Sequence, residues 1–589
     1  MNGNSTLAYF SMEIAVDPRV PTYAGGLGVL AGDTLRSAAD SGLPMVAVTL
    51  LHRKGYLTQS FDQSGWQHTG HADWPVEQFL TELPPRVTVM IEDRTVSLRA
   101  WQHEITGQGG ARVPVFFLDA DLPENAAWDR TLTHFLYGGD AYYRICQEII
   151  LGIGGVRLLR ALGRADVHRY HMNEGHSSLL TLELLVEEAR RAGRGTITEA
   201  DIAAVRARCI FTTHTPVASA HDQYPMDLVG RVLRGGHAFF SHAGGFGAGV
   251  LGQILQREPG SYDPADIFRP EYLLNLTHLA LNLSHYVNGV AKRHAAISQR
   301  LFAKYHIDEI TNGVHAATWV APALHELYDR HMPGWEMDNF SLRYALNLPP
   351  AELWAAHATA KRSLLGRVRI ETGVELDPEI LTLGFARRFT PYKRADLLLT
   401  NPTRLRALAA AAGRFQVIYS GKAHPNDQGG KEIIQHILRV KDTLAPEVRV
   451  VYLENYDLER ARLLVAGCDV WVNTPLPPLE ASGTSGMKAA LNGVPSLSVL
   501  DGWWLEGCIE GVTGWGVGDR PGDGEVTPDG ARTRRDADSL YTKLEGVVLP
   551  GYYREREKFI SVMTHAIALN GSFFNTQRMI QQYALKAYL

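Results

Sequence analysis

The amino-acid sequence predicts an α/β protein built of two doubly wound units, in which helices cover parallel sheets. Short apolar runs of strand length alternate with amphipathic segments along the chain, which is typical of this architecture. The length of 589 residues suggests several domains or two large ones. Two such units that face each other form a deep cleft, and the strand ends beside it are the expected place for ligands.

The predicted elements alternate in both halves of the chain. In the first half, strands are predicted at Met45–Leu51, Val113–Leu118 and Cys209–Thr213, and a helix at Ser177–Arg190. In the second half, the predicted strands are Ile380–Phe385, Phe415–Tyr419, Val448–Leu453 and Val470–Val472, and the predicted helices are Lys431–Arg439 and Asp457–Ala466. One doubly wound unit therefore follows another.

No low-complexity linker marks the boundary between the two units. We place it beside Thr311–Gly313, so that the first unit spans residues 1–311 and the second spans 312–563. A helix is predicted at Pro349–Leu365, with proline at its start, where a missing amide does least harm. The tail, residues 564–589, has a helical composition and is predicted to pack back on the first unit.

Composition narrows the class of protein. The hydrophobic fraction of 45% is that of an ordinary globular protein, and the net charge of -5 gives no reason to expect nucleic acid or an acidic membrane as a partner. The four cysteines are far apart, which fits a reducing compartment better than a zinc site or a disulfide framework. The N-terminus does not resemble a signal peptide, and no apolar window approaches about 18 residues. We therefore expect a cytoplasmic protein without a membrane partner.

A glycine-rich segment, Tyr23–Gly28, precedes the helix-like run Val29–Ala39. Glycines before a helix let backbone amides approach an anion closely, and the start of a helix favours negative charge. The same pattern also fits a simple tight turn.

A cationic segment, Phe385–Arg394, follows a predicted strand directly. Its four cations are Arg387, Arg388, Lys393 and Arg394. Arginine grips phosphate in a fork and lysine supplies a point charge. A solvated basic turn is the alternative, but the apolar strand and the tyrosine within the segment favour a phosphate site in the cleft.

The third segment runs from Glu480 to Lys488 and contains the glycine turn Gly483–Gly486. The helix start after this turn is apolar except for Lys488. Such a lysine either extends its stem along an apolar surface or has a chemical role, because desolvation lowers its pKa and frees the amine to form a Schiff base. The residues alone favour the first reading.

Histidines mark a fourth group, in Asn173–His176 and Thr212–Pro216. The spacing of His171, Glu174 and His176 matches none of the familiar zinc patterns, so we predict no metal site. Hydrogen-bonded histidines in a sugar pocket or a satisfied core are the favoured interpretation.

Taken together, these segments resemble the α-glucan phosphorylase family. Glu480–Lys488, with Leu-Asn-Gly at 491–493 and Leu-Asp-Gly at 500–502, is similar to its cofactor signature, and Arg388 and Lys393 match the spacing of its phosphate-binding stretch. Leu453–Tyr456 resembles its next strand end. Further landmarks in the family's order are Phe10–Glu13, Gly25–Gly28, His176, Thr213–Thr215 and Thr311–Gly313. The resemblance spans nearly the whole chain and fits a short bacterial or archaeal branch.

The resemblance implies a GT-B fold, with two Rossmann-like domains facing a deep catalytic cleft and a C-terminal helix that crosses back. It also implies reversible phosphorolysis of α-1,4-glucan or maltodextrin by inorganic phosphate, which releases glucose 1-phosphate with retained configuration. Pyridoxal 5'-phosphate, held by Lys488, is the implied cofactor, and its phosphate rather than its ring passes the proton. Two neighbouring phosphates repel strongly, so several cations must hold them.

The same resemblance assigns roles to single residues. The implied catalytic residues are Lys488, Arg388, Lys393, His214 and Glu480. Cofactor binding is implied for Lys488, Gly26, Arg387, Tyr456, Thr484, Ser485 and Gly486. Substrate binding is implied for Gly25, Leu27, His176, His214, Asn312, Glu480, Ala481, Ser482 and Gly483.

Some positions depart from the long animal and plant forms, which have lysine at Arg387, arginine at Val29, and other residues at Ser485–Gly486 and Thr390–Pro391. The chain begins almost at the first sheet, so we expect no control by phosphorylation or nucleotides, and a homodimer is possible. Two alternatives remain at this point: a nucleotide-sugar glucosyltransferase on the same fold, and a non-catalytic glucan-binding relative.

Overall fold

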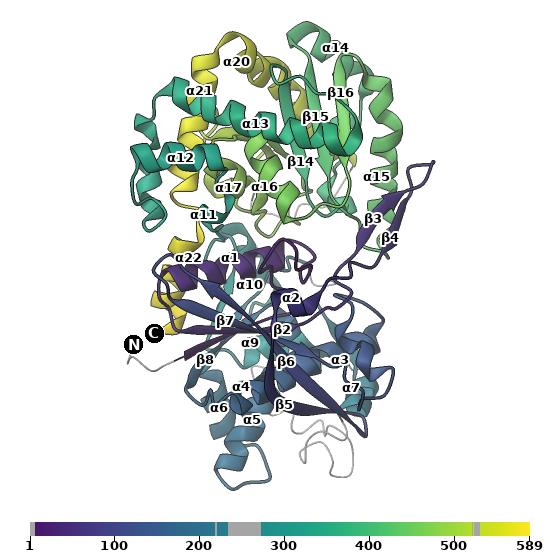
Figure 1. The fold of residues 1–589 in the computed structure, drawn as a ribbon, viewed down its shortest axis with the longest axis vertical. Helices are drawn as coiled ribbons and strands as arrows, with labels where there is room; N and C mark the ends of the chain where they lie inside the picture. Colours follow the sequence, from purple (N-terminus) through teal and green to yellow (C-terminus); the bar gives the residue numbers. More distant parts are fainter. Residues whose placement is uncertain (1–5, 218–220, 234–272, 521, 523–529) are drawn as a thin grey trace.

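The computed structural model describes residues 6–217, 221–233, 273–520, 522 and 530–589. Two large sheets dominate these residues, and Figure 1 shows them one above the other, each with its own helices. Within the described ranges, no helix combines the length and the apolar character that crossing a bilayer requires.

The first sheet has nine strands in the order β13-β12-β9-β8-β1-β2-β7-β6-β5. Their bounds are β1 (Thr6–Ser11), β2 (Met45–Leu50), β5 (Thr81–Ile91), β6 (Arg94–Thr106), β7 (Arg112–Asp119), β8 (Val167–Asn173), β9 (Cys209–Thr212), β12 (Tyr286–Gly289) and β13 (Asp308–Glu309). The pairings from β13 to β7 are parallel, whereas β5, β6 and β7 pair antiparallel. The predicted parallel pairing therefore extends from β13 to β7 and does not include this edge. There, side-chain exposure alternates along β5 and β6, as antiparallel strands with one face toward water allow.

The second sheet has six strands, all paired in parallel, in the order β16-β15-β14-β17-β18-β19. They are β14 (Leu381–Ala386), β15 (Phe415–Ser420), β16 (Val448–Leu453), β17 (Val470–Asn473), β18 (Ser496–Val499) and β19 (Gly514–Val517). All but one of their residues are buried, which explains the largely apolar runs in the sequence. The strand order reverses between β14 and β17, which is where open α/β sheets bind ligands.

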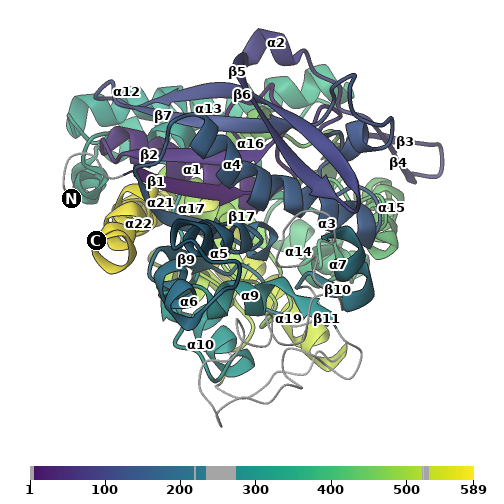
Figure 2. The same cartoon turned by 90° about the horizontal axis from the view of Figure 1, so that it is seen from below.

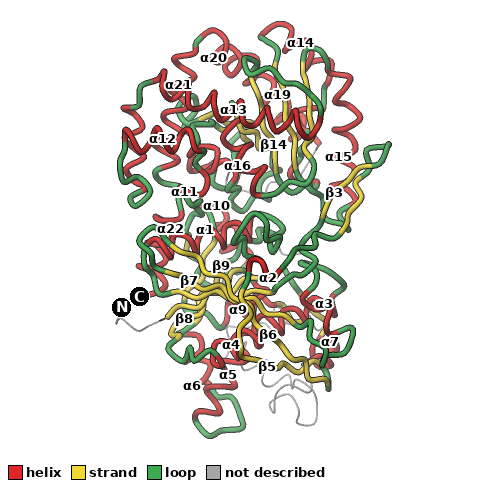
Figure 3. Tube along the Cα trace, in the orientation of Figure 1, coloured by secondary structure: helices red, strands yellow, loops and turns green. Residues whose placement is uncertain are grey.

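Helices cover both sheets (Figure 3). Those around the first sheet are α1 (Gly26–Asp40), α3 (Ala141–Ile149), α4 (Gly155–Ala161), α5 (Leu180–Arg191), α6 (Glu199–Arg206), α7 (Met226–Val232), α9 (Leu276–Asn282) and α10 (Lys292–Leu301). Those around the second are α12 (Pro322–His331), α13 (Pro350–Thr372), α14 (Pro402–Ala412), α15 (Gln428–Val440), α16 (Leu458–Gly467), α17 (Ser485–Leu491), α19 (Gly530–Lys543), α20 (Leu549–Arg554) and α21 (Arg556–His565). The predicted strands and helices named above are confirmed within a few residues at their ends, except that α13 continues beyond the predicted Leu365 to Thr372.

Two segments of the chain cross from one sheet to the other side by side, near Val314 and near Asn575. Val314 forms a bridge with Asn575, and Gly313 lies so close that a Cβ there would meet the backbone carbon of Asn575 at 2.2 Å. Buried apolar residues between Val314 and Phe574 pack in the core of the second sheet. The division at residues 311 and 312 stays a prediction.

After this crossing, the tail lies against the first sheet. Helix α22 (Thr576–Tyr583) packs beside α1, as the view in Figure 2 also shows, and Ser37 and Thr576 share a hydrogen bond of 2.6 Å between their hydroxyls. Met579, Ile580 and Tyr588 join the apolar core between α1 and the sheet. The tail thus ties the end of the chain to its beginning.

The ion pairs of Asp119, at the end of β7, lead us to expect that the free energy of unfolding depends on pH. Its buried carboxylate accepts hydrogen bonds from Arg53 at 2.6 Å and Arg99 at 2.7 Å. Burial alone raises the pKa of Asp119, but the arginines outweigh it and lower the pKa to about 2. Because the unfolded value is about 3.9, this stabilisation is present above that pH and is lost as the pH falls toward about 2. Urea unfolding at several pH values should show Asp119→Asn less stable near neutrality, with the difference shrinking in acid. A difference that stays constant with pH would contradict the assignment.

Candidate active site

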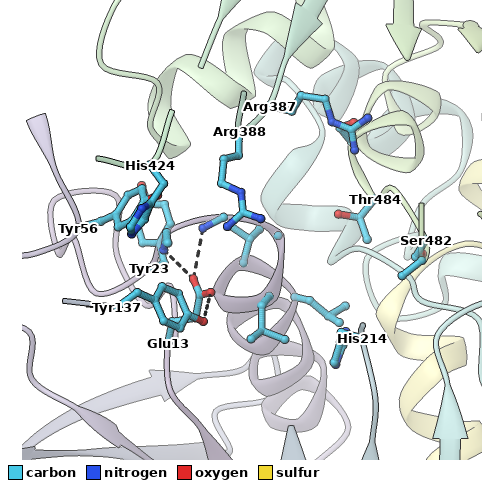
Figure 4. A pocket seen from close by; sticks show the side chains of 18 of the residues that line it. Glu13, Tyr23, Tyr56, Tyr137, His214, Arg387, Arg388, His424, Ser482 and Thr484 are labelled. Carbon is cyan, nitrogen blue, oxygen red and sulfur yellow. Dashed lines mark hydrogen bonds between the residues drawn. The ribbon is translucent and has the colours of Figure 1, made fainter. Parts of the chain in front are cut away.

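A cavity of about 830 Å³ lies between the two sheets and is lined by residues from both of them. Figure 4 shows Arg387 and Arg388 entering it from the side of the second sheet, opposite Glu13 and Tyr137 from the first. The loops that line it follow the carboxyl ends of β1, β8 and β9 in the first sheet and of β14, β15, β16 and β17 in the second. Parallel strands bring these loops to one edge of each sheet, which is why segments far apart in sequence meet here.

The cationic segment follows β14 and lies beside the loop after β17. Glu480 joins the two, because its carboxylate accepts hydrogen bonds of 2.7 Å from both Arg387 and Lys393. Burial opposes the charge on Glu480, but these two cations outweigh it and lower its pKa to about 2. Arg388 also lines the cavity and extends into it toward Glu13 (Figure 4).

Arg394, the fourth cation of the segment, does not belong to this group. Its guanidinium pairs with Asp536 at 2.7 Å and donates to the carbonyl oxygens of Thr474 and Pro475. The phosphate-site interpretation of all four cations is therefore wrong for Arg394, which is buried and fixes the loop after β17 instead.

The glycine segment forms the first turn of α1 and faces the cations. Gly25, Gly26 and Leu27 line the cavity where the free amides of a helix start favour an anion. The carboxylate of Glu13 accepts from the amides of Ala24 at 2.6 Å and Gly25 at 3.2 Å, and so fixes the turn. A Cβ on Gly28 would lie 2.6 Å from this carboxylate, which explains the glycine there.

The predicted sugar-site residues lie at the end of the cavity near β8 and β9. His214 shares a hydrogen bond of 2.6 Å with the side-chain oxygen of Asn173, and its backbone amide donates to Glu174 at 2.8 Å. His176 lies 3.1 Å from a carboxylate oxygen of Asp222. His171 is elsewhere, buried between Tyr588 and Thr212. In the part of the chain that the structure describes, no group of His, Cys, Asp and Glu residues is arranged to hold a metal ion.

Lys488 lies on α17 with its stem buried and its amine at the cavity. The Nζ atom is 4.0 Å from the ring centre of Trp319. Burial lowers the pKa of Lys488 to about 8, an effect that the negative charge of Asp33 partly offsets. Asp33 is fixed in turn by the indole of Trp319, which donates to it at 2.7 Å. A lysine in this setting carries an unusually reactive amine.

Nearly all predicted site residues line this one cavity. The exception is Gly486, which is buried in α17, where a Cβ would meet Trp503 at 2.8 Å. Close packing of α17 against Trp503 therefore explains why this position is a glycine. Thr484 and Ser485, at the start of the same helix, do face the cavity.

A model of the family described as carbohydrate phosphorylase matches residues 163–510, more than half of the chain. The chain belongs to this family. Membership, together with the largely parallel sheets, confirms the predicted α/β class, the GT-B fold and the resemblance found in the sequence.

Named relatives agree with this assignment. The maltodextrin phosphorylase of Thermococcus litoralis is 37% identical, with 98% of this chain and 70% of the relative aligned. The glycogen phosphorylase of Mycobacterium tuberculosis strain H37Rv is also 37% identical, over 99% of this chain and 70% of its own. The glycogen phosphorylase of Aquifex aeolicus is 35% identical, over 99% of this chain and 86% of its own.

Several cavity residues of this phosphorylase were missed by sequence reasoning. Glu13 stands at the end of the landmark Phe10–Glu13 but was given no role, although it closely follows the central strand β1 and precedes the glycine turn. Asp501, in the Leu-Asp-Gly sequence, lies behind the lining of the cavity: it accepts from the backbone amide of Glu480 at 2.9 Å, and burial raises its pKa to about 7. The sequence around Tyr56 and His424 does not mark them as site residues. Their ring centres lie 6.1 Å apart because the two sheets face each other across the cavity.

Proposed function

We propose that this phosphorylase catalyses the reversible phosphorolysis of α-1,4-linked glucan by inorganic phosphate, with release of glucose 1-phosphate and retained configuration. One observation carries the proposal: a buried lysine and three cations, Arg387, Arg388 and Lys393, share a cavity with the glycine turn of the facing sheet. Such a concentration of positive charge in a buried cavity fits two phosphate groups held side by side.

Lys488 has the properties that a pyridoxal phosphate anchor needs. Its lowered pKa leaves part of the amine unprotonated near neutrality, and the cavity beside it has room for a ligand. Tyr456, Thr484, Ser485 and Arg387 would hold the cofactor, with the amide of Gly26 facing them. When bound, the cofactor supplies a phosphate group that takes part in proton transfer to the substrate phosphate.

The remaining cations suit the substrate phosphate. Arg388 offers a planar fork that matches a phosphate, and Lys393 offers a point charge from the same segment. Together they orient the phosphate toward the bond that breaks and offset its charge as the glycosidic oxygen departs.

Unpaired polar atoms support a sugar site next to them. The side-chain oxygens of Asn312 and Ser482 are buried at the cavity and have no hydrogen-bond partner among the described residues. Buried polar atoms are normally satisfied, so these two are matched to ligand hydroxyls. His214, Glu480 and the backbone of Ala481 and Gly483 complete a pocket for the terminal glucose.

Lys393 predicts how phosphate affinity changes with pH. Burial and then Arg387 depress its pKa to about 7, which Glu480 partly offsets. The ammonium is therefore present below that pH and is lost above it, so the KM for phosphate should rise by about ten-fold per pH unit beyond about 7. Arginine stays charged throughout this range, so Lys393→Arg should not show this rise. Parallel profiles for the two enzymes would contradict the assignment.

The proposed reaction is tested by incubating the protein with maltoheptaose and inorganic phosphate. Glucose 1-phosphate should form, and should form only when phosphate is present. Glucosyl transfer from a nucleotide sugar, without phosphorolysis, would identify the protein as a glycosyltransferase of the same fold. Oligosaccharide binding without either reaction would identify it as a non-catalytic relative.

A further inference from the structure

A two-stranded hairpin leaves the first sheet and reaches the second. It consists of β3 (Thr58–Phe61) and β4 (Gln67–Gly70), and Figure 1 shows it extending up to lie beside α15. Its side toward the second sheet carries two glutamines, Gln59 and Gln67, whose exposed fractions are only 3% and 1%. Buried amides on an otherwise polar hairpin need a reason, because burial costs free energy unless every polar atom is paired.

Both glutamines are paired with the backbone of the second sheet's loops. The side chain of Gln59 donates to the carbonyl of Gly421 at 2.9 Å and to Gln67 at 2.8 Å. Gln67 donates to the carbonyl of Ala423 at 2.8 Å and accepts from the amide of Ala423 at 3.0 Å. The hairpin thus fixes residues 421–423, which follow β15.

The same hairpin fixes the loop that follows β16. The side chain of Asn455 accepts from the backbone amide of Gln59 at 2.7 Å and donates to the backbone carbonyl of Gln59 at 3.0 Å. The backbone amide of Asn455 donates to the side-chain oxygen of Gln59 at 3.1 Å. Asn455 has a φ of 54°, a left-handed conformation that asparagine and glycine tolerate best. The next residue, Tyr456, lines the active-site cavity.

Residues 420–423 in turn hold the cationic segment. The amide of Arg387 donates to the carbonyl of Ser420 at 3.2 Å, and the amide of Phe389 donates to that of Lys422 at 3.0 Å. Gly421 has a φ of 150°, and a Cβ there would lie 2.0 Å from the carbonyl oxygen of Arg387. Arg388 therefore lies between two residues whose amides bond to Ser420 and Lys422, and these two are the chain neighbours of Gly421 and Ala423, which the glutamines hold.

We propose that Gln59 and Gln67 are positioning residues for phosphate binding, acting through residues 421–423 and Asn455 on Arg388 and Tyr456. The proposal rests on the proposed function, because it takes Arg388 to be the ligand of the substrate phosphate. The hairpin belongs to one side of the cavity and the cations to the other, so the contact also fixes how the two sides face each other. Catalytic groups lose effect when misplaced by about 1 Å, which makes such a contact consequential.

The test measures inorganic phosphate binding to the pyridoxal-phosphate-loaded protein by calorimetry, together with kcat and KM for phosphate. Gln59→Ala should raise the phosphate Kd and KM by about ten-fold, as expected when a buried network loses one member. The matched control is Gln63→Ala, which removes an exposed glutamine from the turn of the same hairpin and should leave both values unchanged. The thermal midpoint of each variant is measured alongside.

Asn455→Gly approaches the same contact from the other side and keeps the left-handed backbone available. It should also weaken phosphate binding, and the double variant should lie within about two-fold of Gln59→Ala alone, because both changes break one network. This second variant keeps the proposal testable if Gln59→Ala folds poorly.

The proposal is overturned if Gln59→Ala and Asn455→Gly lower the thermal midpoint but leave phosphate Kd and KM at the wild-type values. It is also overturned if their effects on phosphate Kd multiply independently. Failure of the proposed function looks different: the wild-type protein would release no glucose 1-phosphate, while calorimetry would still report whether the hairpin variants alter phosphate binding.

Discussion

Replacement of Lys488 by alanine is expected to abolish phosphorolysis, with a loss of about 10³-fold or more, because Lys488 is the amine that we propose holds the cofactor covalently. The variant should also lose the pyridoxal absorption that lies beyond the protein's own band. Both results follow from the buried position of the amine, whose Nζ lies over the Trp319 ring at the cavity.

The matched control for this change is Lys422→Ala. Lys422 also lines the cavity, and burial lowers its pKa to about 8 as well. It follows β15, however, and not the start of α17, so the cofactor absorption should remain in this variant. If the absorption survives in Lys488→Ala and disappears in Lys422→Ala, the anchor has been assigned to the wrong lysine.

Replacement of Arg388 by alanine has the second largest expected effect. We expect kcat/KM for phosphate to fall by about 10²- to 10³-fold, since a group aimed at developing charge in a buried site is lost. Arg388→Lys keeps the charge but not the planar fork, so it should recover only part of the activity. The absorption of the cofactor should persist in both variants, which separates phosphate binding from cofactor binding. Activity of Arg388→Ala within about two-fold of the wild type would refute the assignment.

The fold was predictable where strands are buried on both faces. The largely apolar runs of β14, β15 and β16 are read directly from the sequence, because a parallel sheet covered by helices leaves few polar positions there. Strand β8 was missed, because its sequence Val-His-Arg-Tyr-His-Met-Asn contains polar residues. The burial of His171 depends on the hydroxyl of Tyr588, which lies more than four hundred residues away in the sequence.

The site was predictable where its chemistry is carried by contiguous segments. The segments at residues 385–394 and 480–488 each stand out in the sequence as candidates, and the strand order explains why they meet. The direction in which each side chain points was not predictable. Arg388 and Arg394 carry the same charge in one segment, but the side chain of Arg394 pairs with Asp536, which lies far along the chain. Glu13 and the hairpin glutamines contribute through contacts between segments that the sequence keeps apart.

The most direct measurement of the central claim is phosphorus NMR of a reaction that contains the protein, maltoheptaose and inorganic phosphate. The α anomer of glucose 1-phosphate should appear as phosphate is consumed, and it should not appear with Lys488→Ala. Formation of the β anomer, of free glucose without phosphate consumption, or of no product at all by the cofactor-loaded protein would contradict the account.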